Sequence, residues 1–192
     1  MTDPDPFDQK DLLLRYLQRG RDAMLSKLDG LGEYDVRRPM TPTGTNLLGL
    51  VKHLANVEFE YFGECFGRPS GEAVPFNEED PNADLVAEAT ESREYIIDRY
   101  RKAWAWADET ISSLPLDAVG HVPWWGRDVT LQWILVHMAT ETHRHAGHAD
   151  IVRETIDGAA GVDTTSDPAW WQAYRDRVER TAREASGSFL AS

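Results

Sequence analysis

The apolar positions of the chain recur at intervals of three and four residues, which is the spacing of one face of an α-helix. The pattern is longest in residues 131–157, where Thr130 is a good N-cap and Gly158 follows the last periodic residue. Four further helices are expected over about residues 7–29, 46–66, 83–114 and 169–184.

The segments between these helices are rich in Gly and Pro and show no periodicity, so residues 30–45, 67–81 and 115–130 are expected to be loops. The last two are longer than a tight connection between helices needs. Trp124 and Trp125 stand in the loop before the long helix. They either cover the core or form the wall of a pocket.

Four long amphipathic helices without strand-like alternation predict an all-α fold, namely a four-helix bundle. The two long connections are compatible with parallel neighbouring helices. We expect residues 1–160 to form the bundle. Residues 161–192 would form a linker and an additional short C-terminal helix, packed on the same domain or against a partner subunit.

Composition narrows the classes of function. Twenty Lys and Arg against 33 Asp and Glu give a net charge of −13, which repels nucleic acid and anionic membranes. No segment approaches the roughly 20 apolar residues of a membrane span, and the N-terminus lacks the basic and apolar regions of an export signal. A single cysteine, Cys65, is compatible with a reducing compartment. We expect it to be a small buried side chain rather than a nucleophile. We therefore expect a cytoplasmic protein that binds neither nucleic acid nor membrane.

The long helix carries four of the six histidines. At about 100° per residue, His137, Glu141, His145 and His148 fall in one stripe beside apolar positions, whereas His143 points the opposite way. Imidazole and carboxylate groups in such a stripe can donate lone pairs to a metal ion.

A single helix cannot close such a site. Glu141 and His145 stand one turn apart, and His53 on the helix of residues 46–66 could complete a set of three ligands. Three protein ligands with an open fourth position are typical of a catalytic zinc site. Spacing alone leaves other pairs open, His137 with Glu141 and His145 with His148. A polar network without metal is also compatible with it.

Two segments together, GTNLLGLVKHLANVEFEYF and LQWILVHMATETHRHAGHADIVRETIDG, resemble the DinB/YfiT-like superfamily, and PWWGRDVT resembles its actinobacterial domain-of-unknown-function branch. The resemblance covers roughly residues 7–160. It implies a four-helix bundle in up-down-down-up order, often dimeric, with a divalent metal between the helices.

The resemblance also implies the ligands. His53 matches the superfamily's histidine on the second helix, and Glu141 with His145 matches its pair on the last bundle helix, as in the related mycothiol-dependent maleylpyruvate isomerase. His148 falls where many relatives have a glutamine, beside the ligands rather than among them.

Characterised relatives use mycothiol, bacillithiol or glutathione, which implies an enzyme that activates such a thiol for transfer to, or isomerisation of, a small electrophile. Zinc or nickel suits the imidazole ligands better than magnesium does. Trp124, Trp125 and Tyr61 are candidates for the wall of the substrate pocket. The alternatives are a hydrolase that uses metal-bound water and a non-catalytic metal-binding stress protein.

Overall fold

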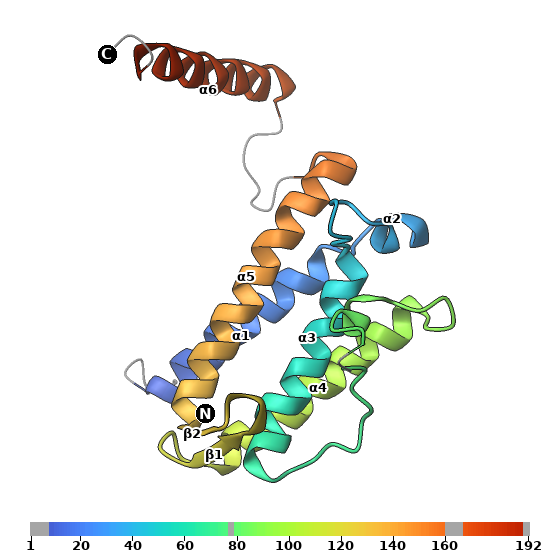
Figure 1. The fold of residues 1–192 in the computed structure, drawn as a ribbon, viewed down its shortest axis with the longest axis vertical. Coiled ribbons are helices and arrows are strands. Elements are labelled where there is room, and N and C mark those ends of the chain that lie inside the picture. The colour runs from blue at the N-terminus through green and yellow to red at the C-terminus, as the bar shows by residue number, and fades with distance from the viewer. Residues whose placement is uncertain (1–7, 77–78, 160–166, 190–192) are drawn as a thin grey trace, which may run out of the picture. The chain divides into compact units, whose positions relative to one another are not determined.

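A computed structural model describes residues 8–76, 79–159 and 167–189, which fall into two compact units, residues 1–159 and 160–192. The first unit is a helical bundle, and the predicted all-α fold is confirmed (Figure 1). Its elements are α1 (Gln9–Ser26), α2 (Glu33–Arg37), α3 (Leu47–Phe62), η1 (Glu64–Phe66), η2 (Ala83–Leu85), α4 (Arg93–Ser113), β1 (Val119–Val122), η3 (Pro123–Trp125), β2 (Arg127–Thr130) and α5 (Leu131–Asp157).

Helices α3 and α4 run parallel to each other. The side chain of Asn46, which caps the start of α3, donates to the Leu85 carbonyl ahead of α4 over 3.3 Å. At the other end, the Thr110 hydroxyl near the end of α4 donates to the carbonyl of Phe62, the last residue of α3, over 2.7 Å. The long connection after residue 67 therefore returns the chain to the end of the bundle where α3 began (Figure 1).

Helices α1 and α5 form a second parallel pair. Lys27, which follows α1, forms an ion pair of 2.7 Å with Asp150 in the last two turns of α5. Figure 1 shows α1 and α5 running in the direction opposite to α3 and α4. The order is up-down-down-up, as the family resemblance implied.

The third bundle helix begins later than its apolar spacing predicted. We expected a helix from about residue 83, but α4 starts at Arg93, where Ser92 caps it by accepting the amide of Tyr95 over 3.0 Å. Residues 83–85 instead form the single turn η2, and Val86 after it is extended.

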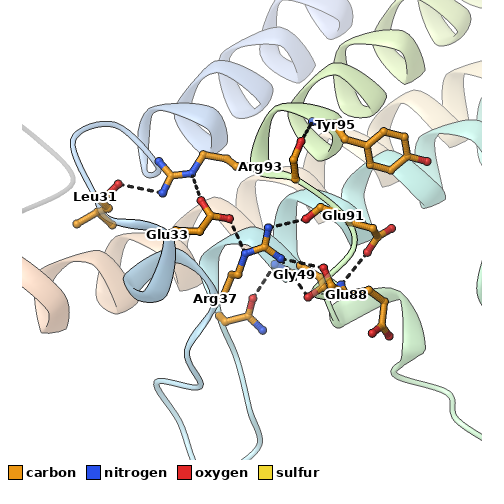
Figure 2. Close-up of polar contacts among 11 residues, drawn as sticks. Leu31, Glu33, Arg37, Gly49, Glu88, Glu91, Arg93 and Tyr95 are labelled. Carbon is orange, nitrogen blue, oxygen red and sulfur yellow. Dashed lines mark hydrogen bonds and ion pairs between the residues drawn. The ribbon is translucent and has the colours of Figure 1, made fainter.

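The short helix α2, which the pattern did not reveal, explains this difference. The guanidinium of Arg37 donates to three backbone carbonyls within residues 87–91, over 2.6 to 3.2 Å (Figure 2). Glu33 binds both Arg37 and Arg93 and joins α2 to the start of α4. Carbonyls that accept from Arg37 are held outside a helical ladder, so this segment stays irregular.

The predicted loop of residues 115–130 contains a β-hairpin, which corrects the expectation of no strands. Strands β1 and β2 are antiparallel, with Val122 opposite Arg127, and η3 followed by Gly126 at φ +61° makes the turn. Strands of four residues are too short for alternation to stand out. Strand β2 ends at Thr130, which is also the N-cap of α5, so the hairpin leads directly into the long helix.

A buried ion pair lies inside the apolar core of the bundle. Arg21 of α1 donates from Nη2 to Glu58 of α3 over 2.6 Å and from Nε over 3.0 Å, and both side chains are 0% exposed. Arg21 also contacts Asp108 of α4 at 2.9 Å. Burial disfavours the charged guanidinium, but the carboxylates of Glu58 and Asp108 outweigh this and raise the pKa of Arg21. Three helices therefore meet at one cation.

The second unit contains α6 (Pro168–Phe189), which has 22 residues and is longer than the predicted helix over residues 169–184. Trp170 and Trp171 contact each other edge to face, and Tyr174 stacks on Trp170. The linker that we expected before it lies mostly outside the described residues, and its packing on the bundle remains a prediction. Within the described ranges no helix is long and apolar enough to cross a membrane.

Replacing Glu58 by Leu should lower the free energy of unfolding by about 3–5 kcal/mol, because the Arg21 charge would remain buried without its main partner. Urea denaturation followed by circular dichroism measures the change. Asp108→Asn is the control; its side chain is 43% exposed, so the loss should be about 1 kcal/mol or less. An unchanged midpoint for Glu58→Leu would show that the pair does not stabilise the bundle.

Candidate metal centre

Three potential ligands meet where α3 faces α5. Among the described residues, His53, Glu141 and His145 form the group of three that could hold an ion, with their ligand atoms within 4.8 Å of one another. Glu141 and His145 are one turn apart on α5, and His145 Nε2 lies 2.9 Å from Glu141 Oε1. His53 Nε2 approaches the same oxygen from α3 at 4.0 Å. The structure thus brings together the three residues that the sequence proposed.

A fourth residue, Asp84, orients His53. Its carboxylate accepts a hydrogen bond from His53 Nδ1, and the side chain is 1% exposed. With the proton held on Nδ1, the Nε2 lone pair points toward Glu141 and His145. Sequence reasoning missed Asp84 because it lies in η2, 31 residues from His53, with no periodic relation to it.

Gly49 allows η2 to approach α3 closely enough for this contact. A Cβ atom at Gly49 would lie 2.0 Å from the carbonyl oxygen of Leu85, which follows Asp84. Asn46 accepts the Gly49 amide and donates to the same carbonyl, so the first turn of α3 and η2 are tied together. A larger residue at this position would displace the loop that carries Asp84.

The donor set fits a divalent cation. Burial lowers the pKa of His145, and His53 and then His148 add to this against the opposing effect of Glu141, so the imidazole is neutral at neutral pH. His145 Nδ1 is buried and has no hydrogen-bond partner in the described part of the chain. A neutral imidazole that binds a cation through Nε2 carries its proton on Nδ1. Two imidazoles and one carboxylate are ligands that zinc and nickel accept.

The other histidines of α5 lie in different surroundings. His137 contacts the rings of Tyr61, Trp125 and Trp133, with centroids 4.8 to 5.3 Å away. His148 is exposed and meets the ring of His145 edge to face at 5.4 Å. His143 is exposed too, on the face turned toward α1, where it binds the carbonyl of residue 139. The two alternative ligand pairs, His137 with Glu141 and His145 with His148, do not gather a third ligand among the described residues.

An aromatic cavity of about 410 Å³ lies one turn further along α3. Tyr61 and Trp124 line it, and Trp124 Nε1 donates to the Tyr61 hydroxyl over 3.1 Å. Trp125 is not part of its lining but packs behind Tyr61, at 5.2 Å between ring centroids. The complete lining is Val57, Glu60, Tyr61, Phe76 and Trp124.

A second cavity of about 510 Å³ is lined in part by His145 and His148, and we term it the polar cavity because its lining is more polar than that of the aromatic one. Leu50, one turn before His53, lines this cavity, whereas Val57, one turn after His53, lines the aromatic one. The potential metal ligands therefore stand between two cavities. Hydroxyl and amide groups contribute to the polar lining, from Thr43, Thr45, Asn46 and Asn82.

Acidic groups near the aromatic cavity have raised pKa values, among them Tyr61, Glu60 and Cys65. Burial raises the pKa of Glu60 to about 7, and the carboxylates of Asp84 and Glu64 add to the shift against a small opposing effect of His53. Burial, with Glu60 and Glu64, raises the pKa of the Cys65 thiol to about 12. Cys65 is 3% exposed and stays protonated at neutral pH, as expected of a small buried side chain.

Replacing Glu60 by Gln should stabilise the protein at high pH. The unfolded carboxyl ionises near pH 4.5 and the folded one near pH 7, so the charged group costs stability as the pH rises through this window. We expect a gain of about 1–2 kcal/mol at pH 8.5, allowing for partial exposure, and none at pH 4.5. Thermal melts at the two pH values, with exposed Glu154→Gln as the control, measure it. A gain that does not depend on pH would contradict this assignment.

Comparisons with known proteins bear on the fold and on the family of the chain. A solved structure described as a conserved protein from Enterococcus faecalis is similar in fold, with a TM-score of 0.56 and 17% sequence identity over 79% of this chain and 98% of that chain. No curated protein sequence matches the chain. The family model described as mycothiol-S-transferase matches residues 12–158, which include all three potential ligands and both cavities. This family is DinB-like, which confirms the resemblance seen in the sequence, and the chain belongs to the mycothiol-S-transferase family.

Proposed function

We propose that this protein is a divalent-metal-dependent transferase that joins a mycothiol-type thiol to a small electrophile. The observation that carries the proposal is the convergence of His53, Glu141 and His145 between two cavities of different polarity. The family match supports thiol transfer as the class of reaction. Zinc or nickel is the proposed metal, held by these three side chains.

The ligand set supports a site that leaves room for a substrate. Three protein ligands are fewer than the four of a closed structural zinc site. A divalent cation bound there would supply the deprotonated thiol that the transfer requires at neutral pH. The protein has no thiolate of its own for this step, since Cys65 is buried and its pKa is raised.

Residues of the two cavities would bind the two substrates. The polar cavity beside His145 and His148 offers hydroxyl and amide groups, which suit the sugar-like part of a thiol carrier such as mycothiol. The aromatic cavity under Trp124, backed by Trp125, suits the electrophile. In this arrangement the sulfur atom enters from one side of the ligands and its target from the other. A cytoplasmic location and a homodimer remain predictions.

His145→Ala should remove both the metal and the transferase activity, because two remaining ligands hold a cation poorly. The test is elemental analysis of the purified protein, followed by an assay of mycothiol consumption with a chromogenic electrophile. His143→Ala is the matched control and should keep the metal content and the rate of the wild type, since its side chain faces α1 rather than the ligands.

The same measurements can refute the proposal. Wild-type protein that binds no stoichiometric metal when zinc or nickel is supplied would remove its basis. Metal without thiol consumption would leave a hydrolase or a non-catalytic metal-binding protein. Loss of metal in His137→Ala but not in His53→Ala would mean that the site is built from α5 alone.

Asp84→Asn should weaken metal affinity about 10- to 100-fold. The neutral amide is a weaker acceptor for the His53 Nδ1–H group than the charged carboxylate, so it orients the imidazole less firmly. Competition with a chromogenic chelator measures the dissociation constant. Asp98→Asn on the surface of α4, with a side chain 73% exposed, provides the same chemical change without the contact. Equal affinities for the two variants would show that Asp84 does not act through His53.

A further inference from the structure

The aromatic cavity has the size of a small-molecule site. Its volume of about 410 Å³ falls in the range of pockets that enclose a drug-sized ligand. Tyr61 and Trp124 meet edge to face at 5.1 Å, and Phe76 adds a third ring. Such rings bury flat apolar ligands well.

The charged residue among the described residues of its lining is acidic. Glu60 lies in the lining together with Val57, Tyr61, Phe76 and Trp124, and no Lys or Arg is among these described residues. Arg127, the cation of the neighbouring aromatic cluster, lies over Trp125 and Trp133, which do not line this cavity. The groups that act electrostatically on Glu60 are Asp84, Glu64 and His53, of which two are carboxylates.

Glu60 lies near the proposed metal site. Val57 follows His53 by one turn of α3 and lines the cavity. A molecule in the cavity therefore lies beside the Glu60 carboxyl and contacts the helical turn of α3 that follows His53. An anionic ligand would have to leave water for a site that presents a like charge and, among its described lining residues, no counter-ion, which is unfavourable.

We propose that Glu60 makes the aromatic cavity a site for neutral or cationic aromatic electrophiles and excludes anionic ones. The description of the ligand as an electrophile rests on the proposed function. The selection by charge concerns binding alone and can be tested without the reaction. The raised pKa of Glu60 means that the exclusion is strongest above pH 7.

The test compares two ligands of nearly equal shape that differ in charge, 4-nitrobenzamide and 4-nitrobenzoate. Binding to the full-length protein is measured at pH 8.5 by isothermal titration calorimetry, without thiol. The benzamide should bind at least about tenfold more tightly than the benzoate, as expected for like charges near a protein surface. Glu60→Gln should reduce this ratio to about threefold or less.

Two variants complete the experiment. Glu64→Gln removes an exposed neighbouring charge outside the lining and should leave the ratio within about a factor of two of the wild type. Trp124→Leu should weaken binding of the benzamide and so locate it in this cavity. Glu60→Gln is not expected to unfold, because it removes a charge that costs stability.

The outcomes are separable from those for the proposed function. Equal binding of the two nitro compounds to the wild type, a ratio unchanged in Glu60→Gln, or no binding of either compound would each overturn the inference. Selective binding in a protein without transferase activity would support the inference and refute the proposed function. Rapid thiol transfer to anionic and neutral electrophiles alike would do the reverse.

Discussion

The buried contact between Arg21 and Glu58 fixes the rotation of α3 in the bundle. A buried charge is tolerated only when its partner of opposite charge is in place. If α3 turned about its axis, the Glu58 carboxylate would leave Arg21 and lie among apolar side chains. With Glu58 directed at α1 and α4, the stripe of α3 that carries His53 and Val57 is directed at α5 and the two cavities. The buried ion pair on one face of α3 therefore helps to set the position of the candidate site on another face of the same helix.

Local signals predicted well those elements whose ends are determined locally. The long helix begins and ends at the expected residues because Thr130 accepts the amide of Trp133 and Gly158 adopts a left-handed conformation at φ +79°. The start of α4 was predicted wrongly because it depends on Arg37, some 50 residues away, whose contacts hold residues 87–91 outside the helix. Distant contacts of this kind leave no periodic trace in the sequence.

The residues of the candidate site also differ in how far local sequence signals predict them. The relation between Glu141 and His145 follows from helical geometry within one element, and it could be read directly from their spacing. His53 was a candidate third ligand from its own helix, but other pairs stayed open until the family resemblance favoured this set, since periodicity does not say which helices face each other. Asp84 and Glu60 were missed because their roles arise from η2 and from burial, which only the folded chain reveals.

Because β2 leads directly into α5, one chain segment supplies both part of the cavity wall and two of the potential ligands. Trp124 of the cavity wall and the ligands Glu141 and His145 belong to one continuous segment, with Thr130 as the joint between hairpin and helix. The turn of the hairpin is held by its own strand pairing and by Gly126, not by the ligands. Replacements in that turn can therefore reshape the cavity wall while the ligand geometry is kept. Under the proposed function, this architecture would let related proteins accept different electrophiles while they keep one metal site.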